Sequence, residues 1–301
     1  MTDYATSLID DGFVLFLLHG VIPHQRHQVR NYNRKHLPMD DFMTFLQSVC
    51  ARGTPVSLPA IVRANQNRTP LPCRAFGITF DDGFANNYTV AAPTLHAMGV
   101  AATFYITTAF VESNLPSWID RIEFAIERTP RTNLRLPSLG IEGVFETPDE
   151  KIRLLEDIRQ IVKRNRDIQP NELAFDIASQ LQAESFDPDP DLDDKMTWPQ
   201  VLELAHNDLF TIGGHTDTHP ILTHLNSADL EREVGVNIAK LSAHLSCPIQ
   251  HFSYPEGQAW CYSDTVITVL KQHGILCAPT AEPGINHVGD DLFHLKRIPV
   301  I

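Results

Sequence analysis

Two neighbouring carboxylates follow an apolar run near residue 80. Residues 77–80 (Gly-Ile-Thr-Phe) lead directly into Asp81 and Asp82, and Gly83 comes next. This pattern predicts a buried strand that ends at the aspartates, with the glycine permitting a sharp turn. Because adjacent aspartates repel each other, their placement at a strand end indicates a bound cation or a catalytic task. The alternative is that an aspartate caps a following helix.

Two histidines lie four residues apart in the second half of the chain. His215 and His219 are flanked by Gly213-Gly214 and Pro220, which disfavour a regular helix, so we expect a loop or single turn after a strand at 209–212. Two imidazoles and one carboxylate form a known type of open zinc site. The alternative is a pair of surface histidines in a chain that contains 14.

Together, residues 79–83 and 215–220 resemble the first two motifs of the polysaccharide deacetylases, carbohydrate esterase family 4 or the NodB homology domain. The resemblance implies that Asp82, His215 and His219 hold a divalent metal, usually zinc, and that Asp81 is the general base. Co²⁺, Ni²⁺ or Mn²⁺ would tolerate the same ligands. In such an enzyme the metal polarises an acetyl carbonyl and activates a water molecule for attack.

The acid that protonates the leaving amine has two candidates. In a subgroup of the family that includes deacetylases of poly-N-acetylglucosamine, this histidine follows the N-terminal strand, and His19 follows the apolar run 13–18. The resemblance therefore implies that His19 is the acid, with His294 as the second candidate. The alternative for His19 is a core histidine whose hydrogen bonds are satisfied within the fold.

Residues 252–257 resemble the third family motif, Arg-x-Pro-Tyr-Gly, with two departures. Ser253 stands in place of the arginine that orients the base in the family, and Glu256 stands in place of the tyrosine. Arg297, on the last expected strand, is the candidate to replace the missing charge; the alternative is an ordinary edge-strand arginine. The backbone N–H of Glu256 is expected to help stabilise the oxyanion.

Composition limits the possible functions. The 301 residues suit one large α/β domain, and 24 Lys and Arg against 37 Asp and Glu give a net charge of −13, which disfavours nucleic-acid binding. Five widely spaced cysteines favour a reducing compartment. Without a basic, apolar leader or a run of about 20 apolar residues, the chain is predicted to be cytoplasmic and to have no transmembrane segment.

The remaining pattern alternates strands with helices. We expect strands at 13–18, 75–80, 100–106, 209–212, 249–254, 275–278 and 295–300, a short strand and turn at 56–62, and helices at 39–50, 87–98, 118–126, 151–168, 172–182, from 197, 227–245 and 264–273. This alternation predicts a parallel α/β sheet, without choosing between an open sheet and a barrel. The family resemblance implies a distorted (β/α)7 barrel. We expect a single domain over 1–301 with a helical insertion at about 110–196.

Two charged segments and three single residues each allow two interpretations. The basic segment 23–35 is either a solvated loop or a lip for an anionic substrate, and the acidic segment 187–194 is either a solvated loop or, less readily, a calcium loop. Trp118, Asp120 and Trp198 either line a sugar platform or serve packing and helix capping.

The family resemblance implies a metal-dependent enzyme that removes an N-acetyl group, or less readily an O-acetyl group, from a sugar. The expected substrate is an acetylated glycan precursor, lipid- or nucleotide-linked, in surface-polysaccharide or O-antigen biosynthesis. Two alternatives remain open. One is a metal-dependent hydrolase of a cyclic, non-sugar amide, and the other is an inactive glycan-binding module, which the altered third motif suggests.

Overall fold

The computed structural model describes residues 2–301, which fall into two compact units. The first unit contains the chain up to His24 together with His36–Asn114 and Lys195–Ile301. The second contains Gln25–Lys35 and Leu115–Asp194. Each unit is therefore built from segments that are distant in the sequence.

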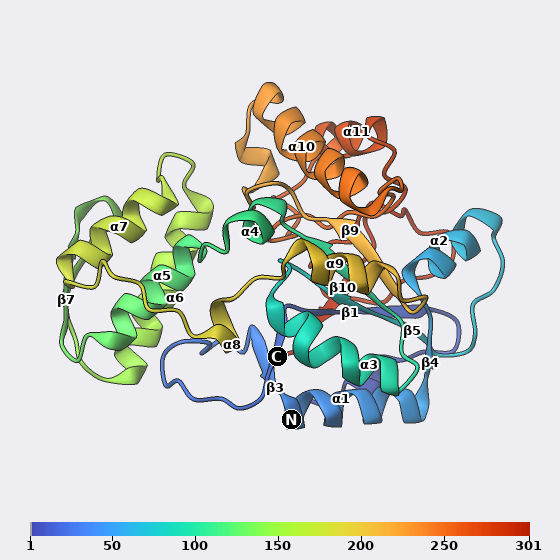
Figure 1. Cartoon of the computed structure of the whole chain (residues 1–301), viewed down its shortest axis with the longest axis horizontal. Helices are drawn as coiled ribbons and strands as arrows, with labels where there is room; N and C mark the ends of the chain where they lie inside the picture. The colour runs from blue at the N-terminus through green and yellow to red at the C-terminus, as the bar shows by residue number, and fades with distance from the viewer. Residues whose placement is uncertain (1) are drawn as a thin grey trace. The chain divides into compact units, whose positions relative to one another are not determined.

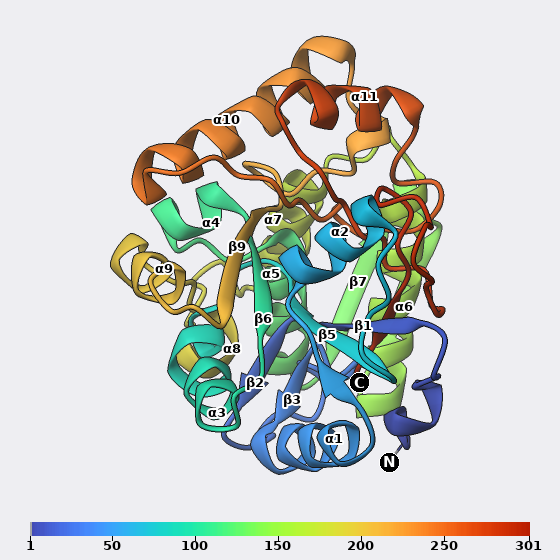
Figure 2. The same ribbon diagram turned by 90° about the vertical axis from the view of Figure 1, so that its right-hand side faces the viewer.

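A parallel sheet forms the centre of the first unit (Figure 2). Its strands are β1 (Phe13–Leu18), β4 (Thr54–Pro55), β5 (Ala75–Phe80), β6 (Ala102–Ile106), β9 (Phe210–Gly214) and β10 (Arg297–Pro299). The strand order is β10-β1-β5-β6-β9, with β4 paired to β5, and every pairing is parallel. Strands β1 and β5 are buried along their whole length, as expected for parallel strands covered on both faces. Two short strands, β2 (Gly20–Ile22) and β3 (His36–Pro38), pair separately.

Beyond β9 the sheet continues as isolated contacts. Gly214 forms a parallel bridge with Phe252, and His251 forms one with Cys277. The backbone N–H of Thr280 donates to the carbonyl of Leu295, close to β10. The fold is the predicted α/β type with a mostly parallel sheet, but the expected strands 249–254 and 275–278 are reduced to single bridges.

Helices surround this sheet. They are α1 (Met39–Arg52), α2 (Leu58–Asn67), α3 (Ala92–Ala97), α4 (Thr108–Ser113), α9 (Trp198–Ala205), α10 (Ser227–Leu245) and α11 (Asp264–Gln272), with short helical turns at Tyr4–Ser7, Asn87–Ala91 and Leu222–His224. Figure 1 shows α1 and α3 on one side of the strands and α10 and α11 on the opposite side. Most of these helices pack against the strands in one large apolar core, while α2 packs against Phe13, Leu15 and Ala75 in a separate cluster.

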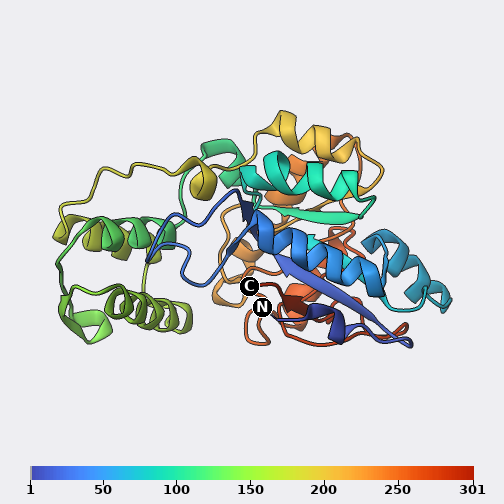
Figure 3. The same ribbon diagram turned by 90° about the horizontal axis from the view of Figure 1, so that it is seen from below.

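The second unit has its own apolar core and its own small sheet. It contains the helices α5 (Trp118–Arg128), α6 (Pro148–Arg164), α7 (Pro170–Gln180) and α8 (Pro190–Asp193), the strands β7 (Thr132–Leu136) and β8 (Ile141–Phe145), and a turn at Pro137–Leu139. Figure 3 shows its three long helices in green and yellow-green. The unit takes in most of the segment expected to be a helical insertion, and it adds an antiparallel hairpin that we did not predict. That both units fold as one domain stays a prediction.

Three local predictions were wrong. The expected strand at 56–62 is the start of α2, because Ser57 caps a helix there and a proline occupies its first turn. The acidic segment is not all loop, since α8 forms one helical turn within it. The helix expected at 87–98 is divided into a π-helical turn followed by α3. No helix between residues 2 and 301 is long and apolar enough to cross a membrane.

Candidate active site

The predicted metal ligands follow two strands of the sheet, β5 and β9, which β6 separates, and the backbone there is strained. Asp82 comes two residues after β5 and has a φ of 76°, while Gly83 has a φ of 90°. After β9, Thr216 and His219 have φ values of 64° and 66°. A β-branched residue rarely adopts this left-handed conformation, so the surrounding structure must impose it. Such strain is typical of functional sites.

Asp82, His215 and His219 converge on one point. One potential ligand atom from each lies within 4.8 Å of the other two. Nε2 of His215 is 3.4 Å from Oδ1 of Asp82, and Nε2 of His219 is 3.2 Å from the same oxygen. Asp82 and His215 are buried, while His219 is half-buried. The structure thus brings together the three residues that the family resemblance assigned to a metal.

The hydrogen bonding of His215 tests whether this group suits a metal. Nδ1 of His215 lies 2.7 Å from the backbone oxygen of Ser253. Because a carbonyl oxygen only accepts, Nδ1 carries a proton, and Nε2, which faces Asp82, is the ring atom that could bind a metal. A ring oriented in this way by a backbone carbonyl is the usual support of a metal-binding histidine. The donor set therefore fits a divalent ion such as zinc, with coordination positions left for water and substrate.

Arg297 holds Asp81 from within the sheet. Its Nη1 and Nη2 each lie 2.8 Å from one oxygen of the Asp81 carboxylate. Nη1 also donates to Oγ1 of Thr79 at 3.2 Å, Nη2 to Oγ of Ser253 at 2.8 Å, and Nε to the backbone oxygen of Thr280 at 2.6 Å. A guanidinium has five N–H donors, and here all five are used. Arg297 is fully buried, so it forms an internal ion pair with Asp81 and is not an edge-strand arginine in solvent.

The pKa of Asp81 reflects these neighbours. Burial alone would raise the pKa of this carboxyl, but the charge and hydrogen bonds of Arg297, together with the charges of His215 and His19, outweigh burial. The result is a pKa below the usual value for aspartate. A carboxylate held ionised can accept a proton.

His19 lies at the end of β1, beside the strand that carries Asp81. The backbone N–H of Asp81 donates to the carbonyl of Leu18 at 3.0 Å, and Nδ2 of Asn87 donates to the carbonyl of His19 at 2.7 Å. His19 is half-buried and close enough to Asp81 to lower its pKa. His294 is exposed instead, with Nδ1 3.0 Å from Oδ2 of Asp291.

Glu256 lies in a bend within the third motif. It has a φ of 62°, and Gly257 after it has a φ of 58°. Its backbone role at the oxyanion stays a prediction. The contributions of Thr79 and Thr280 were missed. Thr79 had a usable signal, because it lies two residues before Asp81 and the side chains of a strand alternate between its faces.

The three proposed platform residues serve packing and capping. Asp120 completes a capping box with Ser117 at the start of α5. Trp198 stacks on His244 with ring centroids 3.8 Å apart. Trp118 packs against the apolar core of the second unit.

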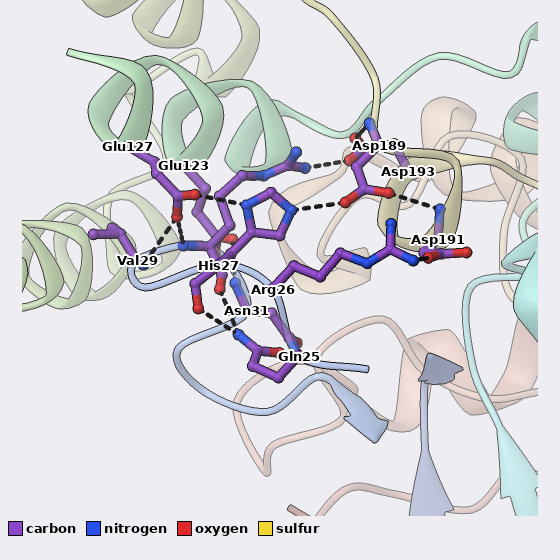
Figure 4. A network of polar contacts seen from close by, with 11 residues as sticks. Gln25, Arg26, His27, Val29, Asn31, Glu123, Glu127, Asp189, Asp191 and Asp193 are labelled. Atoms are coloured by element: carbon purple, nitrogen blue, oxygen red, sulfur yellow. Dashed lines mark hydrogen bonds and ion pairs between the residues drawn. The ribbon is translucent and has the colours of Figure 1, made fainter. Parts of the chain in front are cut away.

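The basic and acidic segments pair with each other inside the second unit (Figure 4). Arg26 lies 3.2 Å from Asp191, and Arg30 forms a buried ion pair with Asp193. His27 lies between two carboxylates, with Nδ1 2.6 Å from Glu127 and Nε2 2.7 Å from Asp189. The solvated-loop interpretation was therefore wrong for the buried Arg30–Asp193 pair, while Arg26 stays largely exposed.

The chain is similar to known proteins in sequence and in fold. The family model described as polysaccharide deacetylase matches residues 68–278. The chain belongs to this family. A search of curated sequences gave no match.

Solved structures share the family fold. The Streptococcus pyogenes deacetylase PplD in complex with acetate has 16% identity and a TM-score of 0.62, covering 97% of this chain and 93% of that one. A de-N-acetylase from Aggregatibacter actinomycetemcomitans has 17% identity and a TM-score of 0.62, over 96% and 94%. The BpsB deacetylase domain from Bordetella bronchiseptica has 17% identity and a TM-score of 0.59, over 97% of both chains. At these identities the likeness concerns the fold.

Proposed function

We propose that the protein is a metal-dependent deacetylase that removes an N-acetyl group from a sugar. The observation that carries the proposal is the three-residue ligand group, formed by Asp82, His215 and His219, directly beside an aspartate that Arg297 keeps ionised. The membership of the polysaccharide deacetylase family and the shared fold with a de-N-acetylase support the same reaction.

The residues divide the work as follows. Asp82, His215 and His219 would hold the ion, which supplies polarisation of the acetyl carbonyl and of the attacking water. Asp81 accepts the proton of that water, because its pKa keeps the carboxylate ionised. Arg297 fixes both oxygens of Asp81 in place. His19 donates a proton to the leaving amine from the neighbouring strand end.

The substrate follows from the family. We propose an acetylated glycan precursor of surface polysaccharide or O-antigen, carried on a lipid or a nucleotide in the cytoplasm, with zinc as the favoured ion. The inactive-module alternative is weakened, because Arg297 supplies the charge that the third motif lacks.

The test combines elemental analysis with an acetate-release assay on acetylated amino sugars. Wild type is expected to hold one equivalent of zinc and release acetate, and His219→Ala is expected to lose both. His19→Ala is expected to keep the metal and lose most acetate release, by about 10²- to 10⁴-fold. His294→Ala is the matched control and is expected to keep both; loss of activity there instead would make His294 the acid. Metal binding without acetate release from any acetylated sugar would contradict the proposal.

A further inference from the structure

The aromatic ring of Tyr105 lies against the guanidinium of Arg297. Tyr105 is on β6 with its side chain fully buried, and Cζ of Arg297 is 5.8 Å from the ring centroid. We propose that Tyr105 is a positioning residue, and that its ring holds the Arg297 guanidinium in the plane of the Asp81 carboxylate. This inference rests on the proposed deacetylation, because the ring acts through Arg297 on the base.

The need for a ring follows from the geometry of the guanidinium. Its five donors all point outward in one plane, toward Asp81, Thr79, Ser253 and the Thr280 carbonyl. The two flat faces of the group form no hydrogen bonds, so they need packing that tolerates a positive charge. An aromatic face provides both packing and electrostatic attraction, and this attraction is strongest where water is excluded.

The neighbouring strand leaves space for the Tyr105 ring. Tyr105 on β6 pairs with Gly213 on the adjacent strand β9. A Cβ atom at Gly213 would lie 2.6 Å from Cδ1 of the tyrosine ring and 2.8 Å from the backbone oxygen of His251. Gly213 is not among the residues of positive φ, so the glycine is needed here for space and not for its backbone conformation. The strand that leads to His215 thus accommodates the ring that supports Arg297.

The hydroxyl group of Tyr105 does not take part in positioning Arg297. Within residues 2–301 it is buried and has no hydrogen-bond partner. Leaving a buried hydroxyl unpaired is unfavourable. Burial also raises the pKa of Tyr105 well above its usual value, so the group stays neutral and does not compete with Asp81 for the charge of Arg297. The ring alone is therefore expected to suffice.

The first test compares substitutions that keep or remove the ring. Tyr105→Phe is expected to retain most of kcat. Tyr105→Leu is expected to lower kcat about tenfold, with KM and zinc content unchanged. Phe76→Leu is the matched control, because Phe76 is equally buried on β5 but packs against Phe16 on the outward side of the sheet. It is expected to lower stability without lowering kcat. A large loss in Tyr105→Phe, or an equal loss of kcat in Phe76→Leu, would overturn the proposal.

The second test asks whether Tyr105 acts through Arg297. In a double-mutant cycle, Tyr105→Leu with Arg297→Lys should be less than about twofold slower than Arg297→Lys alone, because the arginine geometry is already lost. Independent losses that multiply would overturn the proposal.

The same double-mutant cycle can also be measured by urea unfolding, because the unfolding midpoints do not depend on the substrate. If wild type releases no acetate, the proposed function fails, and the midpoints still decide the positioning role. A combined shift smaller than the sum of the single shifts supports coupling of the ring to the guanidinium, and a simple sum contradicts it.

Discussion

Each unit of the molecule contains a buried arginine that faces a buried aspartate, and the two pairs differ in their hydrogen bonding. Arg297 uses all five donors and grips both oxygens of Asp81. Arg30 reaches one oxygen of Asp193, and within residues 2–301 its buried Nε has no hydrogen-bond partner. The two arginine–aspartate pairs are chemically alike, but only one of them is fully satisfied.

The pKa values of the two aspartates move in opposite directions. For Asp81, Arg297 together with His215 and His19 outweighs burial, and the pKa is lowered. For Asp193, burial outweighs the contribution of Arg30, nearby Asp120 adds repulsion, and the pKa is raised. Proximity to an arginine therefore does not by itself keep a carboxylate ionised; burial and the other neighbouring charges also set the pKa.

The largest expected effect is that of Arg297→Met. It leaves Asp81 buried without its partner, which should cost about 3–5 kcal/mol in the free energy of unfolding. Acetate release should fall by at least about 100-fold, because the base loses its orientation and its ionised state. Urea unfolding at pH 7 and the acetate assay measure the two effects. A decrease of less than about 1 kcal/mol in the free energy of unfolding would show that the five hydrogen bonds of Arg297 do not stabilise the fold.

Arg30→Met is the matched variant in the second unit, and its effect should be smaller. We expect a loss of about 1–3 kcal/mol at pH 7, because Asp193, whose pKa is already raised, can take up a proton when its partner is removed. A raised pKa of an acid means that the stability is greater below the pKa and is lost as the pH rises through it. The loss should therefore shrink between pH 7 and pH 5 in urea unfolding. Equal losses at the two pH values would refute this account of Asp193.

The smallest effect is expected at His27, whose ring is partly exposed. Burial would lower the pKa of His27, but the hydrogen bonds to Asp189 and Glu127 outweigh it and raise the pKa. Both partners accept, so the ring is an imidazolium. Its contribution, at most about 1 kcal/mol, should be complete below about pH 6.5 and disappear as the pH rises through the raised pKa.

His27→Gln should therefore reduce the free energy of unfolding in mildly acidic buffer and have little effect in alkaline buffer. His24→Gln, which removes an exposed histidine of the same region, is the control. A constant difference between wild type and His27→Gln across this range would mean that the charge of His27 is irrelevant to stability.

Local patterns predicted those parts of the site that depend on local rules. Asp81, Asp82, His215 and His219 follow apolar runs, and the ends of parallel strands meet at one edge of a sheet. For Arg297 the sequence left two interpretations open, a replacement for the missing motif arginine or an ordinary edge-strand arginine. Its partner Asp81 is 216 residues away, and their contact depends on the strand order β10-β1-β5. No local pattern carries that order.

The charged segments show the same limit. Arg30 and Asp193 are 163 residues apart, so each segment appears as an unmatched run of charge when it is considered alone. The misassigned segment at 56–62 is different, since Ser57 and Pro59 were local signals of a helix start that its apolar content obscured. The hairpin was missed because the alternation of buried and exposed residues in β7 spans only five residues.

The 216 residues between Asp81 and Arg297 also set an order in time. A ribosome that adds about 5–20 residues per second completes that distance in about 10–40 s. During this interval Asp81 and its strand exist without the guanidinium that pairs with this carboxylate. The parallel sheet can begin to form from β1, β5 and β6, but the pocket that holds Asp81 closes only after synthesis reaches β10. A nascent chain halted before this point would carry a nearly complete scaffold in which the negative charge of Asp81 lacks its arginine.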